Sequence, residues 1–406
     1  LRIRGMSTSY PLPGDDSPQP LSILAAYGAL AFPLAGAFIA LQVIVPTFYA
    51  QSLGLSLSAV GAILLAARLW DLFTDPVVGY LSDRTPAAWG KRKAWIVGSA
   101  PLVAGSVWML FNPPAGVGNV FLLLCTFGIY VAGTMTIVPM NAWGAELSPA
   151  YHQRSRIAGA RVVFGLAGTL CALLLVDNSD NVALANSLYT ITLLVVAGIA
   201  VSVPLAALLV PDRGVVVDDG ATLRGAVALL IQPSPFRRLL FAFLLNGLGN
   251  AIPATLFLLY VTHVLVEPNV AGPMLFLYFL CSAVSVPIWV GVSRRLGKHR
   301  AWCWAVLGSC VFFAGAPFLG EGDVLAYGII VAGTGMMIGA DLALPSAING
   351  DLIEWDALEN GRRRPGLFFA LWGTASKFAY ALAVGMAFPL LDAIGFDATT
   401  TGNALD

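Results

Sequence analysis

The feature that most constrains this chain is a series of long apolar stretches separated by short polar ones. Each stretch reaches the roughly 20 residues that a helix needs to cross a bilayer. Marking them predicts eleven membrane-spanning helices, over residues 21–52, 57–82, 92–112, 117–146, 155–176, 184–210, 235–264, 268–295, 299–319, 324–351 and 366–393. Hydrophobic residues make up 58 % of the chain and charged residues only 11 %, against about 25 % charged residues in soluble domains. The sequence therefore predicts an all-α integral membrane protein.

The same composition excludes other classes of protein. Basic and acidic residues number 22 each, so no concentrated basic surface is available for nucleic acid. The five cysteines lie within apolar stretches without a CxxC pair, which is typical of packing rather than of a metal site or disulfides. The three histidines lie in separate segments and no HExxH or GxSxG motif occurs, so we do not expect an enzyme. We expect no cofactor.

The positions of lysine and arginine predict the orientation in the membrane, because cytoplasmic loops retain basic residues. If the N-terminus is cytoplasmic, all of them except Arg68 and Lys377 fall in the N-terminal tail, in cytoplasmic loops or at adjoining helix ends. The outer loops carry acidic residues instead. Residues 1–20 are polar and rich in proline, as expected of a disordered cytoplasmic tail. We expect a multi-pass protein of a bacterial-type cytoplasmic (inner) membrane.

An internal repeat divides the chain into two halves. The segment 76–84 with 90–95 follows the second expected helix, and a similar segment, 287–295 with 297–302, follows the eighth. A second pair, 141–146 and 349–351, follows the fourth and tenth helices. Matched signatures six helices apart predict two six-helix halves, 21–210 and 235–406, joined by a cytoplasmic linker over 211–234. Only eleven helices are visible, so a twelfth at the C-terminus is expected to be missing.

Asp71 and Asp75 lie one turn apart in the second helix, which places both carboxylates on one face about 6 Å apart. Ionisable groups near mid-depth mark functional sites. Two like charges there need a proton or a hard cation between them, and Thr74 offers a further oxygen. The pattern predicts a site for Na+ or H+. The alternative is a structural ion-pair strut with Arg68 and Lys377.

Other polar residues near mid-depth are candidates for the substrate cavity. Asp71, Asp75 and Asp341, set against Arg68 and Lys377, leave one net negative charge, which one monovalent cation would balance. Lys377 is expected to bridge to an aspartate when the cation is absent, or to hold an anionic group of the substrate. The side chains that offer cavity polarity and aromatic surface, or else packing, are Asn246, Asn250, Trp372 and Tyr380.

Opposite charges also collect at the expected cytoplasmic helix ends. They are Asp83, Arg84, Glu146, Arg154 and Arg156 in the first half and Arg294, Arg295, Asp351 and Arg363 in the second. Ion pairs among them would hold the halves together in an outward-open state and break when the inner face opens. A role in membrane topology would explain the bases but not the repeated acids.

The stretch 68–85, which contains Asp71-Leu-Phe-Thr74-Asp75-Pro, together with 89–95, resembles the glycoside-pentoside-hexuronide:cation symporter family of the major facilitator superfamily, the family of melibiose permease. The stretches 349–356 and 361–369, with Lys377, are similar to the same family's connection between helices 10 and 11. The resemblance implies a twelve-helix fold that moves a small solute with Na+ or H+ by alternating access. It also implies that Arg161 lines the cavity, although an anchor at the membrane end is the alternative.

One departure from the family's sugar transporters bears on the substrate. Those members carry an aspartate on helix 1 and another on helix 4, but the corresponding stretches 32–35 and 134–139 contain no acid. This favours a less hydroxylated or amphipathic substrate with an anionic or zwitterionic head, as in the family's lysolipid-carrying relatives, over a plain glycoside. The alternative to a symporter is a transporter-like assembly partner or sensor without transport activity. We expect a monomer with a small-molecule substrate.

Overall fold

The computed structural model describes residues 19–86, 90–148, 150–176, 181–212, 234–360 and 364–393, and within these ranges every regular element is a helix. The first elements are α1 (Leu21–Ala29), α2 (Ala31–Val43), α3 (Val45–Thr47), the π-helical η1 (Phe48–Ser52), α4 (Leu57–Arg84), α5 (Lys93–Phe111), α6 (Asn119–Glu146), α7 (Tyr151–Leu174) and α8 (Asn181–Leu209). They are followed by α10 (Pro235–Leu259), η3 (Tyr260–Val264), η4 (Pro268–Val270), α11 (Ala271–Leu296), α12 (Lys298–Phe313), η5 (Ala316–Phe318), α13 (Val324–Asn360) and α14 (Pro365–Ala393).

The described helices have the dimensions of a membrane bundle. Ten helical segments among the described residues are long and apolar enough to cross a membrane. The expected span 57–82 is not among them, although it forms the 28-residue helix α4, because α4 carries Arg68, Asp71 and Asp75. The prediction of an all-α, multi-pass membrane protein is confirmed.

Most expected helices begin or end a few residues from the bounds in the structure, and two of them differ more. The first, 21–52, is interrupted at Leu30 and Ile44, three and two residues before Pro33 and Pro46, because a proline cannot donate to the carbonyl four residues earlier. The tenth, 324–351, continues to Asn360. Hydropathy does not reveal this extension because acidic residues are interspersed along it, and ion pairs at the helix end hold it.

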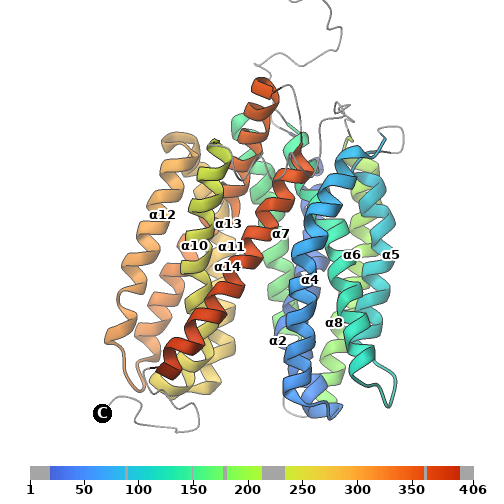
Figure 1. Cartoon of the computed structure of the whole chain (residues 1–406). Coiled ribbons are helices and arrows are strands. Elements are labelled where there is room, and N and C mark those ends of the chain that lie inside the picture. The colour runs from blue at the N-terminus through green and yellow to red at the C-terminus, as the bar shows by residue number, and fades with distance from the viewer. Residues whose placement is uncertain are drawn as a thin grey trace, which may run out of the picture.

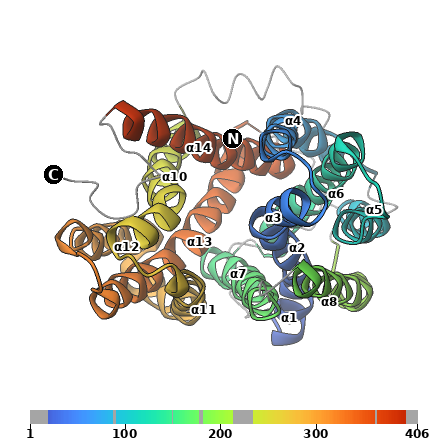
Figure 2. The same ribbon diagram turned by 90° about the horizontal axis from the view of Figure 1, so that it is seen from below.

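The helices form two groups that meet along a central seam. Figure 2 shows α1–α8 on one side, which we call the N-terminal group, and α10–α14 on the other, the C-terminal group. Contacts across the seam join α4 and α6 to α14, and α7 to α11 and α13; the long α4 and α14 lie side by side at the front of Figure 1. The predicted linker and tail lie almost wholly outside the described residues, so the domain boundaries stay a prediction.

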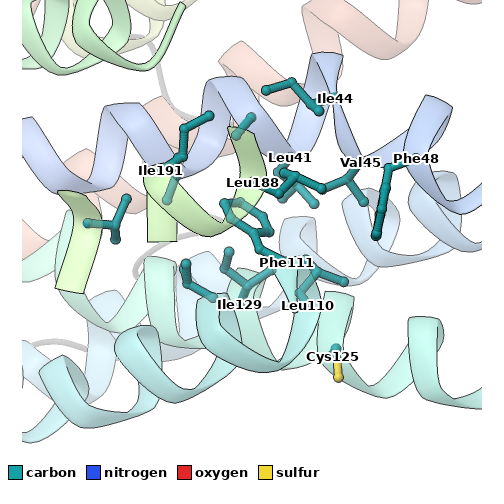
Figure 3. Packing of buried hydrophobic residues seen from close by; sticks show 14 of the residues in the cluster. Leu41, Ile44, Val45, Phe48, Leu110, Phe111, Cys125, Ile129, Leu188 and Ile191 are labelled. Carbon is teal, nitrogen blue, oxygen red and sulfur yellow. The ribbon is translucent and has the colours of Figure 1, made fainter. Parts of the chain in front are cut away.

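The N-terminal group has a tightly packed apolar interior (Figure 3). Its core joins α2, α3 and η1 to α5, α6 and α8 through Leu41, Ile44, Val45, Phe48, Leu110, Phe111, Cys125, Ile129, Leu188 and Ile191. Lipid tails are as apolar as these side chains, so close packing rather than escape from water holds membrane helices together. The N-terminal group is therefore a firm support for the polar residues that α4 and α6 present to the seam.

Glycines allow α4 and α14 to approach closely. A Cβ atom on Gly79 would lie 2.6 Å from the carbonyl oxygen of Gly366, and one on Gly366 would lie equally close to the Gly79 carbonyl. Further along α14, a Cβ atom on Gly373 would lie 2.8 Å from Asp75 Oδ2. Small residues at a helix crossing bring the two backbones together. This close crossing places the polar side chains of α14 within reach of those of α4.

Candidate functional site

Two buried carboxylates share one face of α4. Asp71 and Asp75 are 3 % and 2 % exposed, and their four-residue spacing aligns them along the helix. Pro76 follows directly and removes the backbone donor that would bond to the Leu72 carbonyl. In both aspartates Oδ1 is directed toward α6 and Oδ2 toward α14. The pair therefore faces helices of both groups.

Lys377 of α14 lies between these two carboxylates. Its Nζ atom is 2.5 Å from Asp71 Oδ2 and 2.6 Å from Asp75 Oδ2. A base of the C-terminal group thus bridges two acids of the N-terminal group. The Lys377 side chain is 31 % exposed, so it is not fully buried between the two groups. One lysine balances only one of two ionised carboxylates, which leaves room for one more positive charge.

Threonine hydroxyls complete the surroundings of the carboxylates. Thr134 of α6 lies 2.6 Å from Asp71 Oδ1 and 3.0 Å from Asp75 Oδ1, and its single proton serves one of them at a time. Thr74 donates within its own helix, to the backbone carbonyl and to Oδ1 of Asp71, at 3.2 Å each. The sequence analysis selected Thr74 and missed Thr134. The available signal was the position of Thr134 in the stretch 134–139, where the resembled sugar transporters carry an acid.

Arg68 lies apart from this cluster, although it is only one turn from Asp71. Its guanidinium donates to Gln42 Oε1 at 3.0 Å and to the Tyr130 hydroxyl at 3.4 Å. Both partners belong to the N-terminal group. The strut considered as an alternative to a cation site therefore contains Lys377 but not Arg68.

A second polar cluster surrounds Asp341 of α13, inside the C-terminal group. Asp341 Oδ1 accepts from Asn246 Nδ2 at 2.6 Å and from Trp302 Nε1 at 2.7 Å, and Oδ2 accepts from Asn250 Nδ2 at 2.8 Å. The structure thus brings together three predicted cavity residues and adds Trp302. The signal for Trp302 was its place in the repeated segment 297–302. All three donors to Asp341 are neutral, and none of them belongs to the Lys377 cluster.

The two aromatic candidates on α14 have different surroundings. Trp372 is buried and stacks on Phe243 with ring centroids 3.7 Å apart, so it packs within the C-terminal group. Tyr380 is 48 % exposed. Tyr380 therefore lies on the surface of α14, whereas Trp372 supports the helices behind it.

Arg161 of α7 also reaches across the seam. It donates to Asn141 Oδ1 and, at 3.3 Å, to Ser346 Oγ of α13. Together with Arg154 and Tyr27 these residues line a small cavity of about 20 Å³, which has room for a single water molecule. The cavity is too small for an organic solute, so the two groups are closed against each other here.

We call the end of the bundle that carries Arg92, Arg154 and Lys298 the basic end. A buried network there begins at Asp83, whose carboxylate accepts from Arg92 at 2.6 Å and from the backbone N–H groups of Gly366 and Leu367 at 2.9 and 3.0 Å. Asp83 therefore ties α4 to the N-terminus of α14, where an acid is favourable. Arg92 also pairs with Glu146 at 2.8 Å. Burial alone would lower the pKa of Arg92, but attraction by Glu146 and Asp83 raises it above the usual range.

A second network at the basic end joins α7 to the C-terminal group. Arg154 pairs with Asp351 at 2.8 Å and with Glu354 at 3.4 Å. Lys298, at the start of α12, pairs with Asp351 at 2.6 Å and lies 3.7 Å from the ring centre of Tyr151. The two networks together hold the basic end shut. Sequence analysis missed Arg92 and Lys298, although both lie in the repeated Gly-Lys signature.

Four of the residues predicted to form the cytoplasmic gate are not among the residues named above for these two networks: Arg84, Arg156, Arg294 and Arg295. Arg84 lies over the ring of Tyr80 at 4.4 Å, and Arg156 donates to Gln153 of its own helix at 2.9 Å. Arg294 and Arg295 are exposed, and Arg363 lies outside the described residues. The gate is therefore built around the acids and the buried bases rather than around every charge at this end.

Comparison with known families now assigns the chain. Residues 24–405 match the family described as MFS/sugar transport protein. The chain belongs to this transporter family. Since the match spans almost the whole chain, it covers both groups of helices and both polar clusters. The resemblance to the cation symporters of the major facilitator superfamily is confirmed.

Two curated relatives are informative. The sodium-dependent lysophosphatidylcholine symporter 1 of Gallus gallus is 22 % identical over 377 residues, which cover 82 % of this chain and 71 % of the relative. The glucuronide carrier protein homolog of Escherichia coli K12 is 22 % identical over 351 residues, which cover 83 % of this chain and 76 % of the relative. Both relatives are transporters rather than enzymes, and they support the prediction of cation-coupled symport of a small molecule.

Solved structures support the fold. A bacterial homologue of the iron transporter ferroportin has a TM-score of 0.68 at 16 % identity, over 92 % of this chain and 93 % of its own. The Escherichia coli fucose:proton symporter FucP has a TM-score of 0.61 at 14 % identity, over 89 % and 98 %. At these identities the likeness concerns the fold alone. The predicted major facilitator fold is confirmed.

Proposed function

We propose that this protein is a secondary active symporter in which Asp71, Asp75 and Lys377 form the coupling site. The observation that carries the proposal is the bridge from Lys377 Nζ to both carboxylates, at 2.5 and 2.6 Å, across the seam between the two groups. A bridge that crosses the seam must change when the groups move. Ion binding at the carboxylates and movement of the groups are therefore linked.

The charge at this site favours exchange between Lys377 and a small cation. A second positive charge beside Lys377 would be repelled, so a bound Na+ or proton displaces the ammonium from the carboxylates. Na+ would take oxygens from Asp71, Asp75 and Thr134, the hard ligands that such cations prefer. The freed Lys377 is then available to an anionic group of the substrate. Coupling follows because Lys377 binds substrate well only when the cation has replaced it.

The orientation and the state of the gate complete the proposal. We place the basic end in the cytoplasm, because cytoplasmic loops retain basic residues, in a bacterial-type inner membrane. The ion pairs of Asp83 and Arg154 then close the cytoplasmic side, and they must break when substrate is released inward. The protein acts as a monomer without a cofactor; Na+ or H+ is a co-transported ion.

For the substrate we propose an amphipathic molecule with an anionic or zwitterionic head, such as a lysophospholipid. The two relatives are named for a lysophosphatidylcholine and a glucuronide. A sugar needs paired polar groups for its hydroxyls, since an unpaired hydroxyl in an apolar wall costs binding free energy. The stretches 32–35 and 134–139 supply no carboxylate for that purpose. An apolar body with one charged head fits these walls better.

The test is uptake by the purified full chain in proteoliposomes under a Na+ gradient or a pH gradient. We expect cation-driven uptake of lysophosphatidylcholine, and Lys377→Ala to abolish the cation dependence. Ser376→Ala is the matched control, because within the described part of the chain the Ser376 hydroxyl bonds to the Trp372 carbonyl of its own helix and to no residue of α4. An uptake rate that depends on neither the Na+ gradient nor the pH gradient would overturn the coupling proposal. Cation-driven uptake of a glucuronide instead would overturn only the substrate.

A further inference from the structure

Asp341 is a charged side chain without a counter-charge. Its three hydrogen-bond donors, Asn246, Asn250 and Trp302, are all neutral. Among the described residues no lysine, arginine or histidine lies within ion-pair distance of it. This differs from Asp71 and Asp75, which share Lys377. Asp341 is partly exposed, so it is not fully sealed among its neighbours.

The donors around Asp341 favour the ionised carboxylate. Trp302 Nε1 and the two Asn Nδ2 atoms can only donate, and hydrogen bonds of this kind stabilise the charged form. Asp341 lies ten residues from Asp351 along α13, or about 15 Å inward from the gate. An ionised carboxylate at that depth is costly unless a cation balances it. Among the described residues no basic side chain pairs with the Asp341 carboxylate to balance its charge.

The N-terminal group holds a matching charge of opposite sign. Among the described residues Arg161 is bonded to the neutral side chains of Asn141 and Ser346, and it lies seven residues, or about 10 Å, inward from Arg154 of the gate. Like Arg68, whose partners Gln42 and Tyr130 are neutral, Arg161 is thus a cation without a charged partner in the described part of the chain, and Asp341 is such an anion in the other group. A molecule that carries both charges would satisfy both.

We infer that Asp341 binds a positively charged group, an ammonium, of the transported substrate. Asn246, Asn250 and Trp302 are positioning residues that keep the carboxylate ionised and aimed at the ligand. The inference rests on the proposed function and narrows its substrate class to molecules with a zwitterionic head. It assigns the C-terminal group a role in selecting the substrate that is separate from ion coupling at Asp71 and Asp75.

The test compares two probes with the same acyl chain, lysophosphatidylcholine, which carries an ammonium, and lysophosphatidylglycerol, which does not. Their affinities are measured on purified full-length protein in Na+ by a direct binding assay. We expect the wild-type chain to prefer lysophosphatidylcholine. Asp341→Asn should weaken lysophosphatidylcholine binding about tenfold or more, the effect of one lost charge-assisted contact, and leave lysophosphatidylglycerol binding within about twofold. Asp341→Glu, which keeps the charge, should retain most of the preference.

Other outcomes overturn the inference in distinguishable ways. If Asp341→Asn weakened the binding of both probes equally, and Trp302→Phe did the same, the cluster would serve only to hold α10, α12 and α13 together. An unchanged preference with an altered pH dependence of uptake would make Asp341 a proton site. Na+-driven uptake of a glucuronide without binding of lysophosphatidylcholine would overturn this inference and leave coupled symport intact. Absence of any cation-driven uptake would overturn the proposed function itself.

Discussion

The two acidic sites inside the bundle differ in what lies opposite them. Asp71 and Asp75 of the N-terminal group face Lys377 of the C-terminal group across the seam, whereas Asp341 takes all its bonds from neutral donors of its own group. When the two groups move relative to each other, the first set of contacts must change and the second can travel unbroken. A site that couples ion binding to movement requires contacts across the seam. A site that only binds the substrate can be built from contacts within one group.

The same distinction applies to the basic end. Asp83 bonds to the first backbone N–H groups of α14, which belongs to the other group. Asp356 and Arg364 also form a buried ion pair, at 3.0 Å, but both belong to the C-terminal group. Buried ion pairs of similar chemistry thus have different mechanical consequences. Ion pairs that cross the seam form or break when the transporter changes state, whereas ion pairs within one group stabilise the structure of that group.

The largest expected effect comes from separating the two acidic sites by mutation. Asp75→Asn should weaken Na+ binding by at least about 100-fold, because breaking a buried charge cluster costs roughly 3 kcal/mol or more. Asp341→Asn should leave Na+ binding nearly unchanged. The measurement is the thermal stabilisation of the purified protein as a function of Na+ concentration. Equal losses in both variants would mean that the two acids form one coupled site.

The next effect concerns the gate. Asp83→Asn should open the basic end, shifting the equilibrium between the two states about tenfold or more, because it removes the pair with Arg92 and weakens the cap of α14. The readout is the labelling rate of a cysteine introduced at Ser346, which lines the small cavity behind the gate. Asp356→Asn is the matched control. It should lower thermal stability without changing that labelling rate, and faster labelling in both variants would contradict the comparison.

The residues that sequence analysis found and missed follow one physical rule. Asp71, Asp75 and Lys377 were predictable because a charge inside an apolar helix is conspicuous, and their convergence follows from the fold. Thr134 was missed because a threonine in an apolar helix has no such signal, and its role depends on which helix it faces. The partners of Arg68 could not be predicted either, because the direction of a long side chain depends on packing. Extension of α13 past residue 351 was hidden for the opposite reason, since polar residues end a hydropathy signal but not a helix.

Gly373 offers a way to disturb the site from α14 without changing any charge. An added methyl group would lie 2.8 Å from Asp75 Oδ2, so Gly373→Ala should displace the Asp75 carboxylate from Lys377. We expect a loss of cation-dependent uptake of up to about tenfold, corresponding to roughly 1 kcal/mol of overpacking. Gly385→Ala on the same helix is the control, since nothing lies within 4 Å of a Cβ atom there. A normal rate for Gly373→Ala would indicate that the Lys377 bridge is not needed for coupling.

The smallest effect distinguishes the two threonines beside the carboxylates. Thr134→Val removes a hydroxyl that reaches both aspartates from α6, at 2.6 and 3.0 Å, so Na+ affinity should fall about three- to tenfold, the value of one hydrogen bond or weak ligand. Thr74→Val removes a longer bond to Asp71 that lies within α4, and the affinity should change less than about twofold. The measurement is again Na+-dependent thermal stabilisation. A larger effect at Thr74 than at Thr134 would place the cation on the α4 side of the carboxylates, away from α6, because the cation would then bind the Thr74 hydroxyl of α4 rather than the Thr134 hydroxyl of α6.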